Sequence, residues 1–243
     1  MELEAQERYA EFLAERKAEI EERMVAAAQH AGRDVAEVSL LAVSKTVGVD
    51  EVALACQAGY RLFGENRPQE LSRKLSALRD DPVMAGVRFD MIGNLQKNKI
   101  NQVLGQAELI HSVSSLHLAE AISKRAEVRG LTARVLLEVN VSGELSKSGF
   151  APEETTSALE RIMALPSIAV EGVMTMAPAH DASAARATFA GLTALAGRLR
   201  ASSGLPLEVI SCGMSDDFQI AVEEGSTLLR LGRTVFDPAY VLS

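Results

Sequence analysis

The residue best placed for chemistry is Lys45, which directly follows the apolar run Val38–Ser44. The run is β-branched and aliphatic, and a polar break and a helix-like segment follow it, a pattern that predicts a strand leading into a helix. In α/β barrels, side chains at the C-terminal ends of such strands form the active site. An amine held there, partly removed from water, can attack a carbonyl group. The alternative is an ordinary lysine with a packed stem and a hydrated amine.

Two polar, glycine-rich segments late in the chain could bind a phosphate group. The segment Gly213–Ser215 precedes a helix expected to begin near Asp216, so backbone amides and the Ser215 hydroxyl can meet an anion there. The segment Gly232–Thr234 follows the last expected strand, and barrels often bind phosphate with the loops after strands seven and eight. Alternatively, Ser215 is a helix N-cap, with Asp216 and Asp217 complementing the helix dipole. The two roles are compatible.

Arg230 lies inside the last apolar strand, in the sequence Leu228–Gly232. A charge in a buried strand needs a partner, which is either a carboxylate or an acceptor atom on a ligand. Arginine does not release its proton near neutral pH, so it would donate a hydrogen bond without protonating that acceptor. A lysine nucleophile, a phosphate-binding segment and such an arginine in one pocket indicate pyridoxal 5′-phosphate, which needs all three.

Strand-like and helix-like segments alternate along the chain after a first charged helix over residues 3–31. Eight strands alternating with helices predict a (β/α)8 TIM barrel with an extra N-terminal helix, and a doubly wound open sheet is the alternative. Several strands are continuously apolar, as strands buried on both faces should be. The expected strands are Val38–Ser44, Arg61–Gly64, Val87–Gly93, Glu108–Ser112, Arg134–Asn140, Ala169–Met174, Leu207–Ser211 and Leu228–Leu231. The expected helices are Asp50–Ala58, Pro68–Leu78, Asn98–Leu104, Ser115–Val128, Pro152–Leu165, Ala182–Ser202 and Ser215–Glu224.

Composition narrows the function classes. The 243 residues carry a net charge of −8 and only 4% aromatic residues, which argues against nucleic-acid binding. No apolar run is long enough to span a membrane, and the charged opening is unlike a secretory signal. Two cysteines, Cys56 and Cys212, are too few for a disulfide framework or a zinc site, and the histidines lack metal-ligand spacing. We therefore expect a cytoplasmic protein without a metal.

From residue 38 onward the chain resembles the pyridoxal phosphate homeostasis protein family, single-domain relatives of the alanine racemase barrel. The resemblance covers nearly the whole chain and is carried, in order, by the segments Leu41–Thr46, Phe63–Arg67, Ile92–Lys99, Val139–Gly149, Gly172–Met176, Gly213–Phe218 and Arg230–Gly232. It implies one cofactor-binding barrel domain over residues 1–243.

The resemblance also implies roles for individual residues. Lys45 would hold the cofactor as a Schiff base, Arg230 would face the pyridine nitrogen, and Asn66 would lie near the ring. The phosphate would be held by Ser215, Gly232 and their neighbours, which are Gly213, Met214, Arg233 and Thr234.

The chain departs from the family pattern at two positions. The family usually has an aromatic residue and a histidine where this chain has Phe89 and Asp90. It often has threonine where this chain has Arg233, with Thr234 one position later. A side-chain phosphate contact from Arg233 is therefore open, since its guanidinium could add charge to the phosphate or point outward.

We expect a protein that holds, buffers or delivers pyridoxal phosphate and so affects amino-acid and keto-acid balance, rather than a robust racemase. Racemisation needs a base on each face of the bound substrate, and alanine racemase takes its second base, a tyrosine, from a C-terminal domain that this chain is not expected to have. None of Tyr9, Tyr60 and Tyr240 falls in the polar clusters. A pyridoxal-phosphate-dependent amino-acid racemase or related lyase is the alternative. Expected partners are pyridoxal phosphate and apo-enzymes that use it, and the protein is a monomer or a dimer.

Overall fold

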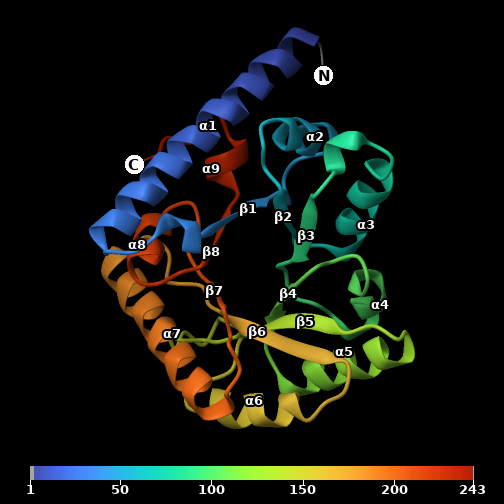
Figure 1. The fold of residues 1–243 in the computed structure, drawn as a ribbon, viewed down its shortest axis with the longest axis vertical. Coiled ribbons are helices and arrows are strands. Elements are labelled where there is room, and N and C mark those ends of the chain that lie inside the picture. The colour runs from blue at the N-terminus through green and yellow to red at the C-terminus, as the bar shows by residue number, and fades with distance from the viewer. Residues whose placement is uncertain (1–2, 243) are drawn as a thin grey trace.

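Eight parallel strands close into a barrel in sequence order in the computed structural model, which describes residues 3–242 (Figure 1). Met1, Glu2 and Ser243, which the expected domain included, lie outside the described residues. The strands are β1 (Ser39–Val43), β2 (Leu62–Glu65), β3 (Arg88–Met91), β4 (Ile110–Val113), β5 (Ala133–Glu138), β6 (Ile168–Met174), β7 (Val209–Ser211) and β8 (Leu228–Leu231). The predicted barrel is confirmed, and the open-sheet alternative is wrong because β1 also pairs with β8, with Leu40 opposite Leu229.

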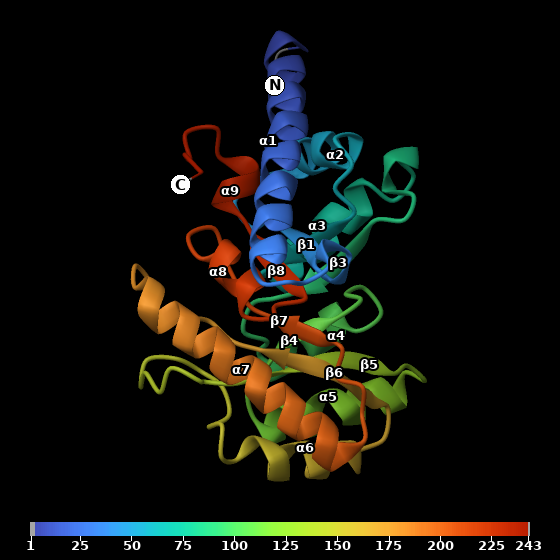
Figure 2. The ribbon, with the colours of Figure 1, turned by 60° about the vertical axis from the view of Figure 1, so that its left-hand side comes forward.

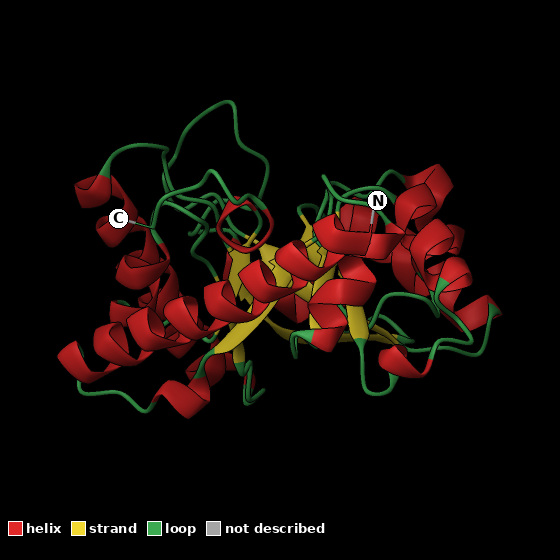
Figure 3. Ribbon diagram, turned by 90° about the horizontal axis from the view of Figure 1, so that it is seen from above, coloured by secondary structure: helices red, strands yellow, loops and turns green. Residues whose placement is uncertain are grey.

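Helices surround the barrel, and the strands lie between them (Figure 3). The apolar side chains between the two layers form the main core, in which the rings of Phe63 and Phe89 stack with centroids 5.3 Å apart. The helices are α1 (Leu3–His30), α2 (Val49–Gln57), α3 (Pro68–Ala77), α4 (Ile100–Val103), α5 (Leu116–Val128), α6 (Thr155–Met163), α7 (Ala182–Ser203), α8 (Phe218–Glu223) and α9 (Arg233–Phe236). Short 3₁₀ turns are η1 (Val35–Glu37), η2 (Pro82–Met84) and η3 (Lys97–Lys99).

Local sequence signals set several helix ends. The Ser115 side chain caps α5 by accepting a hydrogen bond from the Leu118 amide, and the Asp181 side chain caps α7 in the same way. Gly204 ends α7 in the left-handed conformation, with φ of 72°, which glycine adopts without a steric cost.

The extra N-terminal helix α1 lies across the segments that follow β7 and β8 (Figure 2). Its apolar face buries Leu13, Ile20 and Met24. Arg16 on the same helix donates hydrogen bonds to the backbone carbonyls of Thr234 and Tyr240. The helix therefore supports the chain segment in which a phosphate contact is predicted.

Two helix predictions need correction. The helix expected from Ser215 begins only at Phe218, because residues 213–217 form a turn in which the Asp217 carboxylate accepts a hydrogen bond from the Met214 amide. The four-residue helix α9 was not predicted, since a segment that short shows no helical periodicity. Within residues 3–242, no helix is long and apolar enough to cross a membrane.

Candidate functional site

The C-terminal end of the barrel collects the polar segments singled out in the sequence. Lys45 lies two residues after β1, Asn66 directly after β2, and Ser215 in the loop after β7. Gly232 lies directly after β8, and Thr234 lies in α9. Since all strands run in parallel, these segments lie at the same end of the barrel.

The backbone directly before Lys45 is buried and held by hydrogen bonds. The preceding residue, Ser44, is fully buried, and its hydroxyl donates a hydrogen bond of 2.7 Å to the Glu65 carboxylate. The buried Lys74 amine from α3 forms an ion pair with the same carboxylate and donates to the Ser44 carbonyl oxygen at 2.6 Å. These bonds fix the backbone at the end of β1. The Lys45 side chain is itself exposed and makes no hydrogen bond or ion pair with another described residue.

Arg230 is the buried cation of the barrel interior. Only 6% of it is exposed, and its guanidinium donates to the Ser211 hydroxyl at 2.7 Å and to the Thr175 carbonyl oxygen at 3.1 Å. Among the described residues, no carboxylate lies within ion-pair distance of it. Burial lowers the pKa of Arg230, but a guanidinium stays charged near neutral pH. A buried donor group without a direct counter-ion suits an uncharged acceptor on a ligand.

The loops after β7 and β8 form an anion-binding arrangement. The Thr234 amide donates a hydrogen bond of 3.2 Å to the Ser215 hydroxyl oxygen, which joins the two loops. The Thr234 hydroxyl is fully buried and has no hydrogen-bond partner among residues 3–242. The amides of Ser215 and Asp216 donate to no acceptor in the described chain. Two free amides beside a free buried hydroxyl fit a phosphate group.

The N-cap alternative for Ser215 is wrong. Asp217, not Ser215, precedes the first residue of α8, and its side chain makes no capping bond with that helix. Gly213 introduces the turn with φ of 92°, and a Cβ atom there would lie 2.5 Å from that of Ala221. Glycine is therefore required at this position. Met214 is about one-third exposed at the surface of the same turn.

Arg233 is held by Asp216 and Tyr240. Its guanidinium forms an ion pair of 2.6 Å with Asp216 and lies over the Tyr240 ring, 5.2 Å from the centroid. Both partners of the ion pair are well exposed. These contacts favour the outward of the two orientations that the sequence left open. The buried Thr234, one position later, provides the side-chain hydroxyl.

Tyr240 comes closer to the site than its sequence position indicated. Its hydroxyl lies 2.8 Å from both the Ser215 carbonyl oxygen and the Asp216 carboxylate, so the tyrosine packs against the loop after β7. Burial, followed by the bond with Asp216, raises the pKa of the phenol, while the charge of Arg233 acts in the opposite direction. Tyr240 thus supports the loop and stays protonated near neutral pH.

Asn66 lies half-buried beside a close backbone crossing. A Cβ atom on Gly93 would lie 2.3 Å from the Asn66 carbonyl oxygen, so only glycine lets the loop after β3 pass the end of β2 so closely. The Asn66 side chain makes no hydrogen bond within the described chain. Its amide is therefore available to a ligand.

Sequence reasoning missed Glu138, at the C-terminal end of β5. It shares a face of its strand with Leu136, which packs in the interior, so it also points inward. Both carboxylate oxygens are buried without a partner in the described residues, and burial raises the carboxyl's pKa. A carboxylate directly after the apolar run Val135–Leu137 was the available signal.

His111 and Asp90 form a buried pair that the sequence did not predict. His111 is fully buried in the interior, and its Nε2 lies 3.0 Å from the Asp90 carboxylate. Burial lowers the pKa of His111, so the imidazole is neutral near pH 7. No group of three metal-ligating side chains occurs among the described residues.

Sequence comparison relates the chain to known proteins over most of its length. The family described as alanine racemase, N-terminal domain, matches residues 16–238. The pyridoxal phosphate homeostasis protein of Pseudomonas aeruginosa is 40% identical over 225 residues, covering 92% of this chain and 94% of that protein. The protein of the same name from Aquifex aeolicus is 37% identical over 223 residues, covering 91% of this chain and 96% of that one.

Solved structures agree with this relationship. A protein of unknown function from Bifidobacterium adolescentis superposes with a TM-score of 0.89 at 37% identity, covering 94% of this chain and 96% of that one. PipY of Synechococcus elongatus, solved with PLP (pyridoxal phosphate) bound, gives a TM-score of 0.79 at 31% identity, covering 92% and 99%. Alanine racemase from Corynebacterium glutamicum, at 19% identity and a TM-score of 0.64, shares the fold.

Proposed function

Since the chain belongs to the pyridoxal phosphate homeostasis protein family, with the alanine racemase N-terminal fold, we propose that it binds pyridoxal 5′-phosphate at the C-terminal end of its barrel. Its role there is to hold, buffer or deliver the cofactor. One observation carries the proposal: a free lysine amine, an unpaired buried arginine and free phosphate donors all lie at one end of the barrel. These are the three groups that pyridoxal phosphate needs.

Each group of the protein has a distinct task in this proposal. The Lys45 amine binds the aldehyde carbon covalently with loss of one water, and the fixed backbone of Ser44 holds the lysine at the mouth. Arg230 donates a hydrogen bond to the pyridine nitrogen. Ser215, the turn from Gly213 to Asp216, Gly232 and Thr234 hold the phosphate, while Asn66 lies near the ring. When bound, the cofactor supplies a reactive carbonyl group and an electron-accepting ring.

A pyridine nitrogen that accepts a hydrogen bond from Arg230 stays unprotonated, which favours a carrier over a racemase. A guanidinium donates without protonating the pyridine, so the ring withdraws electrons weakly. Tyr9 and Tyr240 donate their hydroxyls to backbone carbonyls, of Phe236 and Ser215 respectively, and Tyr60 is buried in the outer core. Within the described chain, no tyrosine therefore points freely into the mouth as a second base.

The proposal is tested by titrating the purified protein with pyridoxal phosphate and recording its absorbance. We expect a saturable yellow complex that Lys45→Ala abolishes and that the control Lys124→Ala, an exposed lysine on α5, retains. A wild-type protein that stays colourless at saturating cofactor would refute the proposal.

A racemase or related lyase is separated from a carrier by deuterium exchange at Cα of several amino acids in the loaded protein. A carrier would form a stable complex with little exchange, and brisk exchange with turnover would favour the enzyme.

We further propose a cytoplasmic location, a single barrel domain and transfer of the cofactor to apo-enzymes. Transfer is tested by mixing the loaded protein with a pyridoxal-phosphate-dependent apo-enzyme and following recovery of that enzyme's activity.

A further inference from the structure

A continuous chain of four side chains crosses the barrel interior from β8 to β3. Arg230 Nη1 lies 2.7 Å from the Ser211 hydroxyl oxygen. The same oxygen lies 3.3 Å from His111 Nδ1, and His111 Nε2 lies 3.0 Å from Asp90 Oδ2. All four residues are at least nine-tenths buried, and their strands are β8, β7, β4 and β3. The chain therefore links the two ends of the interior without water-exposed members.

The hydrogen bonds along these four side chains can have only one donor-to-acceptor direction if every polar group is to be paired. A guanidinium only donates, so Arg230 donates to Ser211. The single Ser211 proton then goes to His111 Nδ1, which must be the unprotonated nitrogen of a neutral imidazole. His111 carries its proton on Nε2 and donates it to Asp90, as a carboxylate requires. A tautomer with the proton on Nδ1 would give Ser211 two incoming donors and leave its own hydroxyl proton without an acceptor.

The charges at the two ends of the chain are opposite. Arg230 has no carboxylate within ion-pair distance in the described residues, although a buried cation is costly without a counter-charge. The carboxylates of Asp217 and Glu138 act on Arg230 through space, and Asp90 is joined to it by hydrogen bonds through Ser211 and His111. Both bridging groups are neutral and polarisable by the hydrogen bonds at either side.

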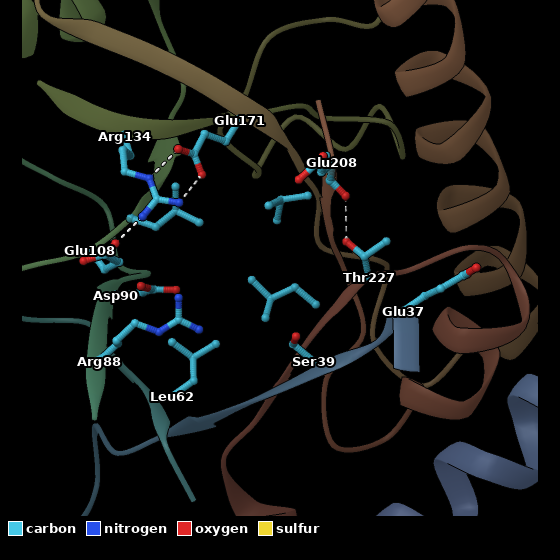
Figure 4. Close-up of a pocket in the computed structure, with 13 residues that line it drawn as sticks. Glu37, Ser39, Leu62, Arg88, Asp90, Glu108, Arg134, Glu171, Glu208 and Thr227 are labelled. Carbon is cyan, nitrogen blue, oxygen red and sulfur yellow. Dashed lines mark hydrogen bonds and ion pairs between the residues drawn. The ribbon is translucent and has the colours of Figure 1, made fainter. Parts of the chain in front are cut away.

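The Asp90 end of the chain lies at the N-terminal end of the barrel. Figure 4 shows its carboxylate at a cavity of about 220 Å³, beside the side chains of Arg88 and Arg134. Arg134 is held between Glu108 and Glu171, and Asp90 adds to the causes that raise its pKa, of which the bond with Glu171 is the largest. Asp90 Oδ1 has no hydrogen-bond partner in the described chain. Asp90 thus shares this cavity with arginine and glutamate side chains, remote from the residues expected to touch the cofactor.

We propose that Asp90 is a positioning residue for Arg230, which it orients through His111 and Ser211, and so tunes how the protein binds the pyridine nitrogen. The inference rests on the proposed function, because Arg230 is the expected partner of that nitrogen. Asp90 is the acceptor at the end of these hydrogen bonds. A neutral residue there can donate to His111 Nε2 and reverse the tautomer.

The test uses Asp90→Asn with two readouts. In the cofactor-free protein, ¹⁵N NMR of labelled histidine, with the His111 signals assigned by their loss in His111→Gln, should show Nε2 protonation. Asp90→Asn should shift the population toward the Nδ1-protonated form. In the loaded protein, the same variant should weaken pyridoxal phosphate binding about tenfold, in the range of one charge-assisted hydrogen bond, and shift the absorbance maximum. The matched control is Asp80→Asn, an exposed aspartate in the loop after α3.

The two readouts separate failure of this inference from failure of the proposed function. If the wild type binds no pyridoxal phosphate, the function proposed above is wrong, while the NMR readout still tests the hydrogen-bond chain. Should Asp90→Asn fail to fold, Asp90→His takes its place, because an imidazole can also donate to His111 Nε2; the same loss of affinity is expected. Asp90 variants that match Asp80→Asn in His111 tautomer, cofactor affinity and absorbance would overturn the inference.

Discussion

Lys74 Nζ donates a hydrogen bond of 2.6 Å to the carbonyl oxygen of Ser44, the residue directly before Lys45. The same amine forms a buried ion pair with Glu65, whose carboxylate also accepts the Ser44 hydroxyl proton. A helix outside the barrel therefore controls the backbone on which the proposed cofactor lysine stands. The Lys74–Glu65 ion pair holds the end of β1, and the Lys45 side chain makes no hydrogen bond or ion pair within the described residues.

Replacing Lys74 by methionine should strongly destabilise the protein. The variant keeps the shape of the stem but leaves the Glu65 carboxylate buried without its cation, which typically costs about 3–5 kcal/mol. Denaturant unfolding measures the change, with Lys124→Met as a surface control expected to stay within about 0.5 kcal/mol of the wild type. A Lys74→Met protein as stable as this control would show that the ion pair does not support the end of β1.

Thr234→Val should weaken phosphate binding without loss of stability. The Thr234 hydroxyl has no partner in the described residues, so removing it breaks no internal hydrogen bond. It should lower the affinity for pyridoxal phosphate about tenfold, and leave the affinity for pyridoxal, which lacks the phosphate, unchanged. Titrations with both compounds give the ratio of the two affinities for the variant and the wild type, and Thr132→Val, at an exposed threonine, is the control. Equal losses for the two compounds would place Thr234 away from the phosphate.

Arg233→Gln should change little. The Arg233–Asp216 pair is well exposed, and such pairs contribute about 0–1 kcal/mol to stability. Because the guanidinium is already paired with Asp216 in an exposed position, pyridoxal phosphate affinity should stay within about threefold of the wild type, the equivalent of one surface interaction. A tenfold or greater loss in the same titration would mean that Arg233 turns inward to the phosphate.

Glu138→Gln should alter how stability depends on pH. Burial raises the pKa of Glu138 above its value in the unfolded chain, so the folded protein binds the proton more tightly. This contribution to stability is fully present below the unfolded pKa, near 4.5, and is lost as the pH rises through the folded pKa. The glutamine variant should therefore gain stability relative to the wild type as the pH increases across that window.

The measurement is denaturant unfolding at several pH values from 4 upward, comparing each variant with the wild type. Asp217, whose pKa burial also raises, and His111, whose pKa burial lowers, titrate alike in both proteins and cancel in the difference. The exposed Glu153→Gln controls for the loss of one negative charge. A stability difference independent of pH would show that the Glu138 carboxyl is not shifted upward.

The sequence predicted the barrel because continuous apolar runs and their polar ends are local signals. Each predicted strand contains or overlaps an observed one, and the buried runs of β5 and β8 needed no tertiary information. The start of α8 was wrong, since the Asp217 side chain bonds to the Met214 amide and holds a turn where a helix was expected. The helix α9 is too short for periodicity to reveal.

The candidate site was less accessible to sequence reasoning than the fold. The positions of Lys45, Ser215 and Arg230 follow from strand ends, and the structure brings them to one end of the barrel. The pairing of His111 with Asp90, and the packing of Tyr240 against Ser215, join residues 21 and 25 positions apart that only the folded chain places in contact. The contacts of Arg233 with Asp216 and Tyr240 likewise exist only in the folded chain, and no sequence pattern indicated them.

The central claim is that Lys45 holds pyridoxal phosphate covalently, and peptide mapping tests it most directly. The wild-type protein is incubated with the cofactor, reduced with borohydride to fix the linkage, digested and analysed by mass spectrometry. We predict one stoichiometric adduct, on the peptide that contains Lys45, and none in Lys45→Ala. An adduct spread over surface lysines such as Lys97 and Lys124, or unchanged labelling of Lys45→Ala, would contradict the account.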